Sequence, residues 1–119
     1  MEFNYLYGKQ ADQFSYVNIP KMLIKEEAFS AVSLEAKMLY GLIMERMGMY
    51  QKNNWKDEQG RVFVVYPIQE IMDDMNRSEN SVKKYMTELE AAGLLEKRER
   101  AKGYPDMLYL KRLTYAVEA

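Results

Sequence analysis

The sequence of 119 residues contains neither cysteine nor histidine. Without cysteine there are no disulfides and no thiolate metal ligands. Without histidine the usual general base near neutral pH is missing, and so is the commonest ligand of zinc, copper and iron. Serine and cysteine triads in their common forms are therefore excluded. We expect no enzymatic activity, no catalytic residue, no metal and no cofactor.

Other features of binding and catalytic sites are also missing. The six glycines are scattered, and none of them belongs to a phosphate-binding loop. Adjacent acids on a helix point about 100° apart, so Asp73-Asp74 does not form a paired carboxylate site. The segment Asp57-Glu58-Gln59-Gly60 lacks the alternating ligands of a calcium loop. We interpret both acidic pairs as solvated groups or turn residues.

Long apolar runs and a secretory signal are absent as well. No stretch of about 18 uncharged apolar residues occurs, which predicts no membrane span. The first ten residues have no basic segment followed by an apolar one, so they are not a signal peptide. A cytoplasmic protein of one domain is the expectation from this length and from 48% hydrophobic and 29% charged residues.

The net charge of −1 conceals an uneven distribution. Residues 1–75 carry 8 basic and 11 acidic side chains, a net of −3, whereas residues 76–112 carry 9 basic and 6 acidic, a net of +3. Attraction to phosphates depends on local potential within a Debye length of about 8 Å. The positive C-terminal part is therefore compatible with nucleic-acid binding, although it does not demonstrate it.

Residues 68–95 predict two short helices joined by a tight turn. Ile68, Ile71, Met72 and Met75 recur at helical spacing, and Pro67 suits the first helical position. Ser78 is a good N-cap for the second helix, and Gly93 ends it. In that helix the apolar face holds Val82, Tyr85, Met86 and Leu89, and the opposite face holds Asn80, Lys84, Thr87 and Ala91. In a major groove, asparagine reads adenine and lysine reads guanine or holds a phosphate. An ordinary solvated face is the alternative.

A charged β-hairpin follows directly. Residues 94–100 and 106–111 predict two strands, joined by a turn at Lys102-Gly103-Tyr104-Pro105. A helix-turn-helix followed by such a hairpin predicts an α+β fold, mainly α. Its form is a winged helix-turn-helix with a long central helix and a C-terminal β-hairpin wing. We expect residues 14–112 to form this domain.

The rest of the chain supplies the body of that domain. Residues 1–13 predict a tail or an extra strand, and residues 113–119 a tail or the start of a linker. Residues 14–19 predict a strand that pairs with residues 61–66, and residues 21–29 a short helix. Residues 33–51 predict a helix apolar over most of its circumference, with its polar positions on one narrow line from Lys37 to Lys52. Such a helix is central to the core or partly covered by another subunit, and we expect part of it in a homodimer interface. Trp55 is expected to pack its loop onto the core.

Several segments, taken in order, resemble a known family: IPKMLI at 19–24, SLEAKMLYGLIMERM at 33–47, NNWKDEQGRVFVVY at 53–66 and AAGLLEKR at 91–98. Together they are similar to the N-terminal domain of RepA-type replication initiators of plasmids and mobile elements in low-GC Gram-positive bacteria. The resemblance covers residues 14–112 and departs from the family pattern at Asn53-Asn54, where Asn-Gly is usual before the tryptophan. Rolling-circle initiators use a histidine-ligated metal, which this chain cannot provide.

The resemblance implies double-stranded DNA binding at repeated origin sites as a dimer. It also implies contact with host replication proteins through a further C-terminal domain. The elements of this chain that the resemblance assigns to DNA binding are the second helix, residues 79–92, and the wing, residues 97–104. The expected base-facing residues are Asn80, Ser81, Lys84 and Thr87. The expected phosphate-facing residues are Arg77, Lys83, Lys97, Arg98, Arg100 and Lys102. The alternatives are a transcriptional regulator with the same fold and a winged helix used only for protein–protein contact.

Overall fold

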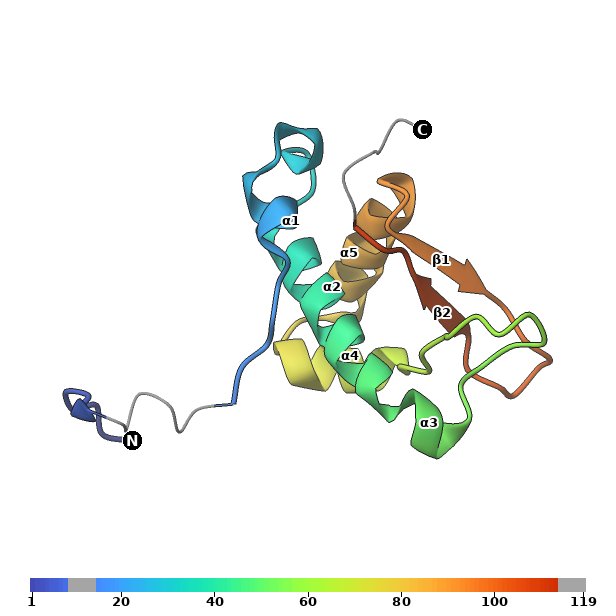
Figure 1. Cartoon of the computed structure of the whole chain (residues 1–119), viewed down its shortest axis with the longest axis horizontal. Coiled ribbons are helices and arrows are strands. Elements are labelled where there is room, and N and C mark those ends of the chain that lie inside the picture. Colours follow the sequence, from blue (N-terminus) through green and yellow to red (C-terminus); the bar gives the residue numbers. More distant parts are fainter. Residues whose placement is uncertain (9–14, 114–119) are drawn as a thin grey trace.

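The computed structural model describes residues 1–8 and 15–113. The helices are α1 (Lys21–Lys25), α2 (Leu34–Arg46), α3 (Tyr50–Asn53), α4 (Ile68–Met75) and α5 (Glu79–Ala91). Two 3-10 turns, η2 (Glu27–Phe29) and η3 (Met47–Met49), follow α1 and α2. The strands β1 (Leu95–Arg98) and β2 (Met107–Leu110) form an antiparallel hairpin. Figure 1 shows α2 at the centre of the helices and the hairpin at one side. In the described part of the chain, none of the helices has the length and apolar character needed to cross a membrane.

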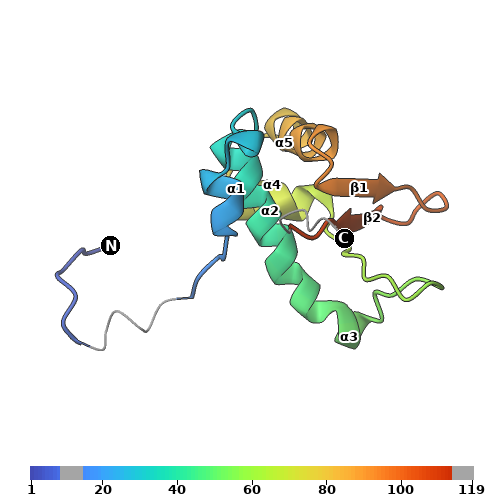
Figure 2. The ribbon, with the colours of Figure 1, turned by 45° about the horizontal axis from the view of Figure 1, so that its top comes forward.

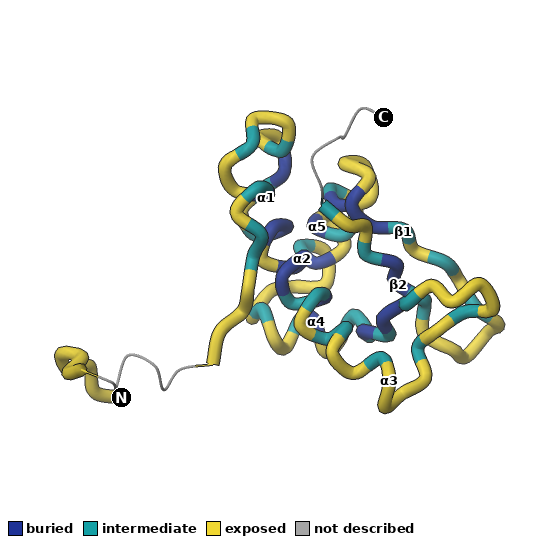
Figure 3. Tube along the Cα trace, in the orientation of Figure 1, coloured by how far each residue is buried: buried dark blue, intermediate teal, exposed yellow. Residues whose placement is uncertain are grey.

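The core is built around one face of α2. Ala36, Leu39, Tyr40 and Ile43, spaced as one helical stripe, are at most 1% exposed. The residues that α4, α5 and the hairpin contribute to the same cluster are Ile71, Val82, Tyr85, Leu89, Leu94, Leu95 and Leu108. Figure 3 shows the buried positions gathered where these elements meet. The Tyr40 hydroxyl also donates to the Lys111 carbonyl oxygen at 2.7 Å, which ties α2 to the end of the hairpin.

The helix-turn-helix follows the local signals in the sequence. Asn76 ends α4 in the left-handed conformation (φ 53°), which asparagine tolerates better than most residues. Ser78 then caps α5, because its Oγ accepts from the Ser81 amide at 3.2 Å. Gly93, with φ 78°, lets the chain leave α5 and enter β1. One detail of the prediction is wrong: Pro67 precedes α4 instead of occupying its first position.

The predicted strand at residues 14–19 and its pairing with residues 61–66 are wrong. Residues 15–19 form no strand, and Phe14 lies outside the described residues. Val64 instead pairs with Leu108 of β2, with N–H to O distances of 2.8 and 2.9 Å in the two directions. Both segments have the composition of a strand, and hydrogen bonding to the hairpin decides which one joins the sheet.

Residues 17–19 have another role, because they cross α2 at Gly41. A Cβ at position 41 would lie 3.0 Å from the Asn18 carbonyl oxygen and 3.0 Å from side-chain carbons of Val17 and Ile19. This contact buries part of the polar line expected from the sequence, and Lys37 is only 5% exposed. The predicted helix over 21–29 is α1 followed by η2, with Glu26 between them in an extended conformation. Trp55 packs against the core cluster, as predicted.

The two ends of the chain are described only in part. Residues 1–7 have no regular secondary structure, and Gly8 has 3-10 character. Residues 9–13, which belong to the predicted tail or extra strand, lie outside the described residues. The same is true of residues 114–119 of the predicted C-terminal tail.

Candidate nucleic-acid interface

The side of α5 that faces away from the core is polar and exposed. Val82 and Leu89 are fully buried, whereas Asn80, Lys84 and Thr87 are exposed. The face of α5 that the sequence predicts to contact DNA bases is therefore exposed to solvent. The contact of these side chains with DNA stays a prediction.

The polar groups on this face differ in their availability. Ser81 Oγ accepts from Ser78 Oγ at 3.0 Å beside the helix cap, and Ser81 is half-buried. Thr87 Oγ1 donates to the Lys83 carbonyl oxygen at 2.9 Å, which leaves its methyl group for apolar contact such as a thymine methyl. Within the described residues, the Asn80 amide and the Lys84 ammonium have neither a hydrogen-bond nor an ion-pair partner. These two groups are therefore the ones available for reading base edges.

A groove lies between α5, the hairpin and the start of α4, with an apolar floor that includes Ile68 and Ile71, and Asp106 at its edge. It has a volume of about 570 Å³, and Lys83, Thr87 and Glu90 line it from α5, with Lys97 and Tyr104 from the hairpin. Lys83 Nζ lies 3.3 Å from a Glu79 carboxylate oxygen, and Lys97 Nζ lies 4.0 Å from one of Glu90. Ion pairs exposed to this degree stabilise little, so both lysines can exchange these partners for phosphates.

The remaining cations of the hairpin do not share this groove. Side chains alternate along a strand, so Lys97 faces the groove and Arg98 lies on the other side of the hairpin. There the Arg98 Nε lies 2.9 Å from Glu96 Oε2, and its guanidinium lies 4.9 Å from the Tyr109 ring centroid. Arg100 donates from Nε to the Pro105 carbonyl oxygen at 2.8 Å. The structure therefore separates Arg98 from the face that α5 presents.

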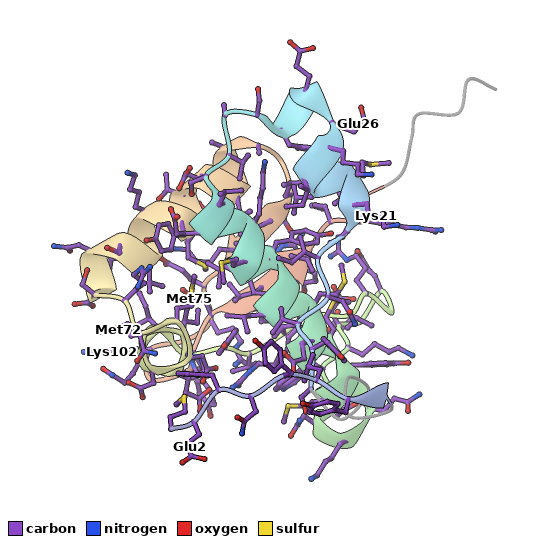
Figure 4. The ribbon with its side chains drawn as sticks, turned by 90° about the vertical axis from the view of Figure 1, so that its left-hand side faces the viewer. Glu2, Lys21, Glu26, Met72, Met75 and Lys102 are labelled. Carbon is purple, nitrogen blue, oxygen red and sulfur yellow. The ribbon has the colours of Figure 1, made fainter. Side chains whose placement is uncertain are left out.

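Two further predicted phosphate contacts lie at opposite ends of the surface. Lys102 is exposed in the turn of the hairpin, and Figure 4 labels it. Arg77 is exposed in the turn before α5, where its Nη1 donates to the Asn76 carbonyl oxygen at 3.1 Å. Arg77 also lines a second groove against α2, away from the hairpin. The six predicted phosphate-facing cations are therefore not gathered on one surface of the molecule.

Residues 15–119 match the family described as Replication initiator protein A (RepA) N-terminus. The chain belongs to this family. A curated relative, "41 kDa protein" of Lactobacillus helveticus, is 28% identical over 102 residues, which cover 81% of this chain and 29% of the relative. The chain thus spans less than a third of the length of that relative.

Solved structures share the fold of this RepA N-terminal domain. One described as "Structure of Rep-DNA complex" has a TM-score of 0.79 and 25% identity, and covers 96% of this chain and 88% of its own. Another, "N-Terminal domain of DNA binding protein", has a TM-score of 0.78 and 25% identity, with 97% and 88% covered. A third, "Structure of MDR initiator", has a TM-score of 0.77 at 22% identity, with 95% and 89% covered, and supports the fold alone. The fold is a winged helix, as predicted.

In this RepA N-terminal domain, Glu88 anchors α5 to α2, a role that the sequence did not reveal. Its Oε1 accepts from the Ser33 amide at 3.0 Å, and its Oε2 accepts from Ser33 Oγ at 2.8 Å. Ser33 is also the N-cap of α2, where its Oγ accepts from the Ala36 amide at 3.1 Å. A carboxylate is favourable at a helix N-terminus, because the helix dipole places partial positive charge there. The contact joins residues 55 positions apart, so no local pattern identifies it.

Asp57 anchors the loop before Val62 to the outer side of the hairpin. Burial acts to raise the pKa of its carboxyl, but hydrogen bonds from the Arg61 amide and guanidinium, the Tyr109 hydroxyl and the Gln59 amide lower that pKa to about 2. Figure 2 shows this loop extending on the same side of the molecule as the turn of the hairpin. The four residues of Asp57-Glu58-Gln59-Gly60 are turn residues, as predicted, and Gly60 adopts φ 80°.

Proposed function

We propose that this domain binds double-stranded DNA in a sequence-specific manner at repeated sites of a replication origin. In this proposal α5 enters the major groove and the hairpin follows the phosphates. The observation that carries it is the exposed face of α5, where Asn80 and Lys84 have unpaired polar groups. That face lies beside a groove bordered by Lys83 and Lys97. Membership of the replication-initiator family and the likeness to a Rep–DNA complex support it.

The structure refines which residues we propose in each role. Asn80 and Lys84 read base edges, Thr87 offers a methyl contact, and Ser81 maintains the helix cap beside them. Lys83, Lys97 and Lys102 hold phosphates on the side of the hairpin, and Arg77 holds one near the start of α5. Arg98 and Arg100 have positions that are better suited to shaping the hairpin than to touching DNA.

The wider biology is part of the same proposal. The domain acts by binding, without catalysis or a cofactor, in the cytoplasm of a bacterium that carries the element. It acts as a homodimer. We place engagement of host replication proteins outside this domain, and the Lactobacillus relative is longer, with 29% of it covered by this chain.

Binding-site selection from a random duplex library, followed by fluorescence anisotropy on the selected sequence, tests this proposal. Lys84→Ala is expected to cost about 1–3 kcal/mol on the selected site and to relax the preference at one position. Lys97→Ala is expected to weaken all duplexes and to reduce the slope of log K against log salt by about 0.9. Arg98→Ala is the matched control, one residue away on the other side of the strand, and should leave the slope unchanged.

Two results would overturn the proposal. One is failure to select any sequence, with no complex on random duplex at micromolar protein and low salt, which favours a protein-binding winged helix. The other is wild-type affinity and selectivity in both lysine variants, which would show that DNA meets a different face.

A further inference from the structure

The first residues of the chain form an apolar arm that the body of the domain does not cover. Met1, Phe3, Tyr5 and Leu6 are 107, 87, 86 and 60% exposed. Figures 1 and 2 show residues 1–8 lying apart from the helices. Several large apolar side chains exposed on one short segment make that segment a candidate interaction site.

An apolar groove lies where the N-terminal segment crosses the body. Its walls are Val17 and Ile19 of that segment, Met38 and Leu42 of α2, and Met75 of α4, and its volume is about 310 Å³. This is about ten times the share of volume of one water molecule in the liquid, which leaves space for aromatic side chains. Figure 4 shows this side of the molecule, with Met75 on α4 and Glu2 on the arm.

The apolar surface continues beyond the groove along α2. Leu34 and Met38, one helical turn apart, are 64% and 53% exposed. Glu35, Asp74 and Arg77 supply charges at the rim. The arm carries a single charged side chain, Glu2, so its match to the groove is apolar.

We propose that the arm of one copy, residues 1–7, binds in the groove of a second copy between its α2 and α4, and that the exchange is reciprocal. Each copy has both an exposed arm and an open groove, so a two-fold axis satisfies both pairs at once and closes the assembly as a dimer. Burial of large apolar side chains in two grooves supplies the driving force. This inference assigns surfaces to the proposed homodimer, and it does not depend on which DNA the domain reads.

Disulfide trapping tests the exchange directly, because the chain has no cysteine of its own. We would mix Tyr5→Cys protein with Met38→Cys protein under mild oxidation. The linked peptides 1–9 and 38–46 would then be identified by mass spectrometry after trypsin. The matched control is Ile24→Cys on α1, since Ile24 is 47% exposed and Met38 is 53% exposed. We expect a 5–38 link between chains and at least tenfold less of a 5–24 link.

Sedimentation equilibrium supplies a second measurement that needs no cysteine. The double variant Phe3→Ala with Tyr5→Ala is expected to raise the dimer dissociation constant at least about tenfold, as loss of buried aromatic anchors does. Its melting temperature at a concentration where the protein is monomeric should match that of the wild type, because both side chains are exposed in one copy.

Met38→Glu should weaken the dimer similarly from the groove side. An equimolar mixture of the arm variant and the groove variant should recover part of the dimer, because one intact arm then meets one intact groove. A 5–24 link as abundant as the 5–38 link would overturn the proposal. So would dimers of wild-type stability in both variants, or a wild-type chain that is monomeric at tens of micromolar. None of these measurements contains DNA, so their failure leaves the proposed DNA binding intact.

Discussion

Replacement of Glu88 by alanine should loosen α5 from the body of the domain. The variant loses two hydrogen bonds to a carboxylate, at 3.0 and 2.8 Å, both made by Ser33. Hydrogen bonds to charged groups contribute about 1.5–3 kcal/mol each when buried. Both residues here are only half-buried, so water replaces part of each bond. We therefore expect a loss of about 2 kcal/mol in the free energy of unfolding, within the range of contacts at a helix terminus.

Thermal unfolding followed by circular dichroism measures this loss. The entropy of unfolding is about 2.1 cal/mol/K per residue, so a loss of about 2 kcal/mol corresponds to a fall of about 8 °C in Tm for a chain of this length. Glu88→Gln should cost less than half as much, because its amide oxygen still accepts from the Ser33 amide. Glu90→Ala on the same helix is the control, since its contact with Lys97 is exposed and long, at 4.0 Å. We expect that control to change the free energy of unfolding by no more than about 0.5 kcal/mol.

The loss of DNA affinity in Glu88→Ala should be only partly explained by its loss of stability. Because Glu88 orients α5 without touching DNA in the proposed complex, Glu88→Ala should lower specific affinity more than affinity for random duplex. A Tm within 2 °C of the wild type, or an equal fall in Glu90→Ala, would refute this account of how α5 is held.

Three further perturbations test other parts of the structure. The pKa of Asp57 is about 2, below its ordinary value of ~3.9. The stability that the Asp57 carboxylate adds to the folded state is therefore complete above about pH 4. It is lost as the pH falls toward 2. Urea midpoints at pH 2–5 should fall more steeply in the wild type than in Asp57→Asn, and parallel curves would contradict the assignment. Gly41→Ala should destabilise by about 1–3 kcal/mol because its Cβ would lie 3.0 Å from residues 17–19, whereas Gly48→Ala, with no atom within 4 Å of its Cβ, should be neutral or stabilising in chemical denaturation. Lys102→Ala should weaken selected and random duplexes equally in anisotropy titrations, and a loss confined to the selected site would show that Lys102 reads bases.

The parts of this fold that the sequence predicted are those that depend on local chemistry. Helical spacing around Ile71 and Val82, the cap at Ser78 and the positive φ at Gly93 each act within a few residues. They locate both helices of the helix-turn-helix and the start of the hairpin. The apolar face of α5 follows from the same periodicity, and so does the exposure of its opposite face.

The features that the sequence did not predict depend on distant partners. Residues 14–19 and 61–66 have similar strand-forming compositions, and only the hydrogen bonds between Val64 and Leu108 distinguish them. The contact of Glu88 with Ser33 likewise has no signal within either segment. The orientation of Lys97 could have been inferred, because strand alternation places it on the same side as buried Leu95 and opposite Arg98.

The pairing of Val64 with Leu108 also limits strand pairing between the sheets of neighbouring copies. Leu108 lies opposite Lys97 of β1 in the hairpin, and its amide and carbonyl both bond to Val64 on the other side, so the middle of β2 is covered on both sides. Among the described residues, the edge left to this sheet at β1 is four residues long, and Glu96, Lys97 and Arg98 occupy three of its positions. Short, charged edges resist strand-to-strand polymerisation. If copies bind side by side on consecutive repeats, as proposed, they can therefore remain discrete particles and do not join into a continuous β-sheet.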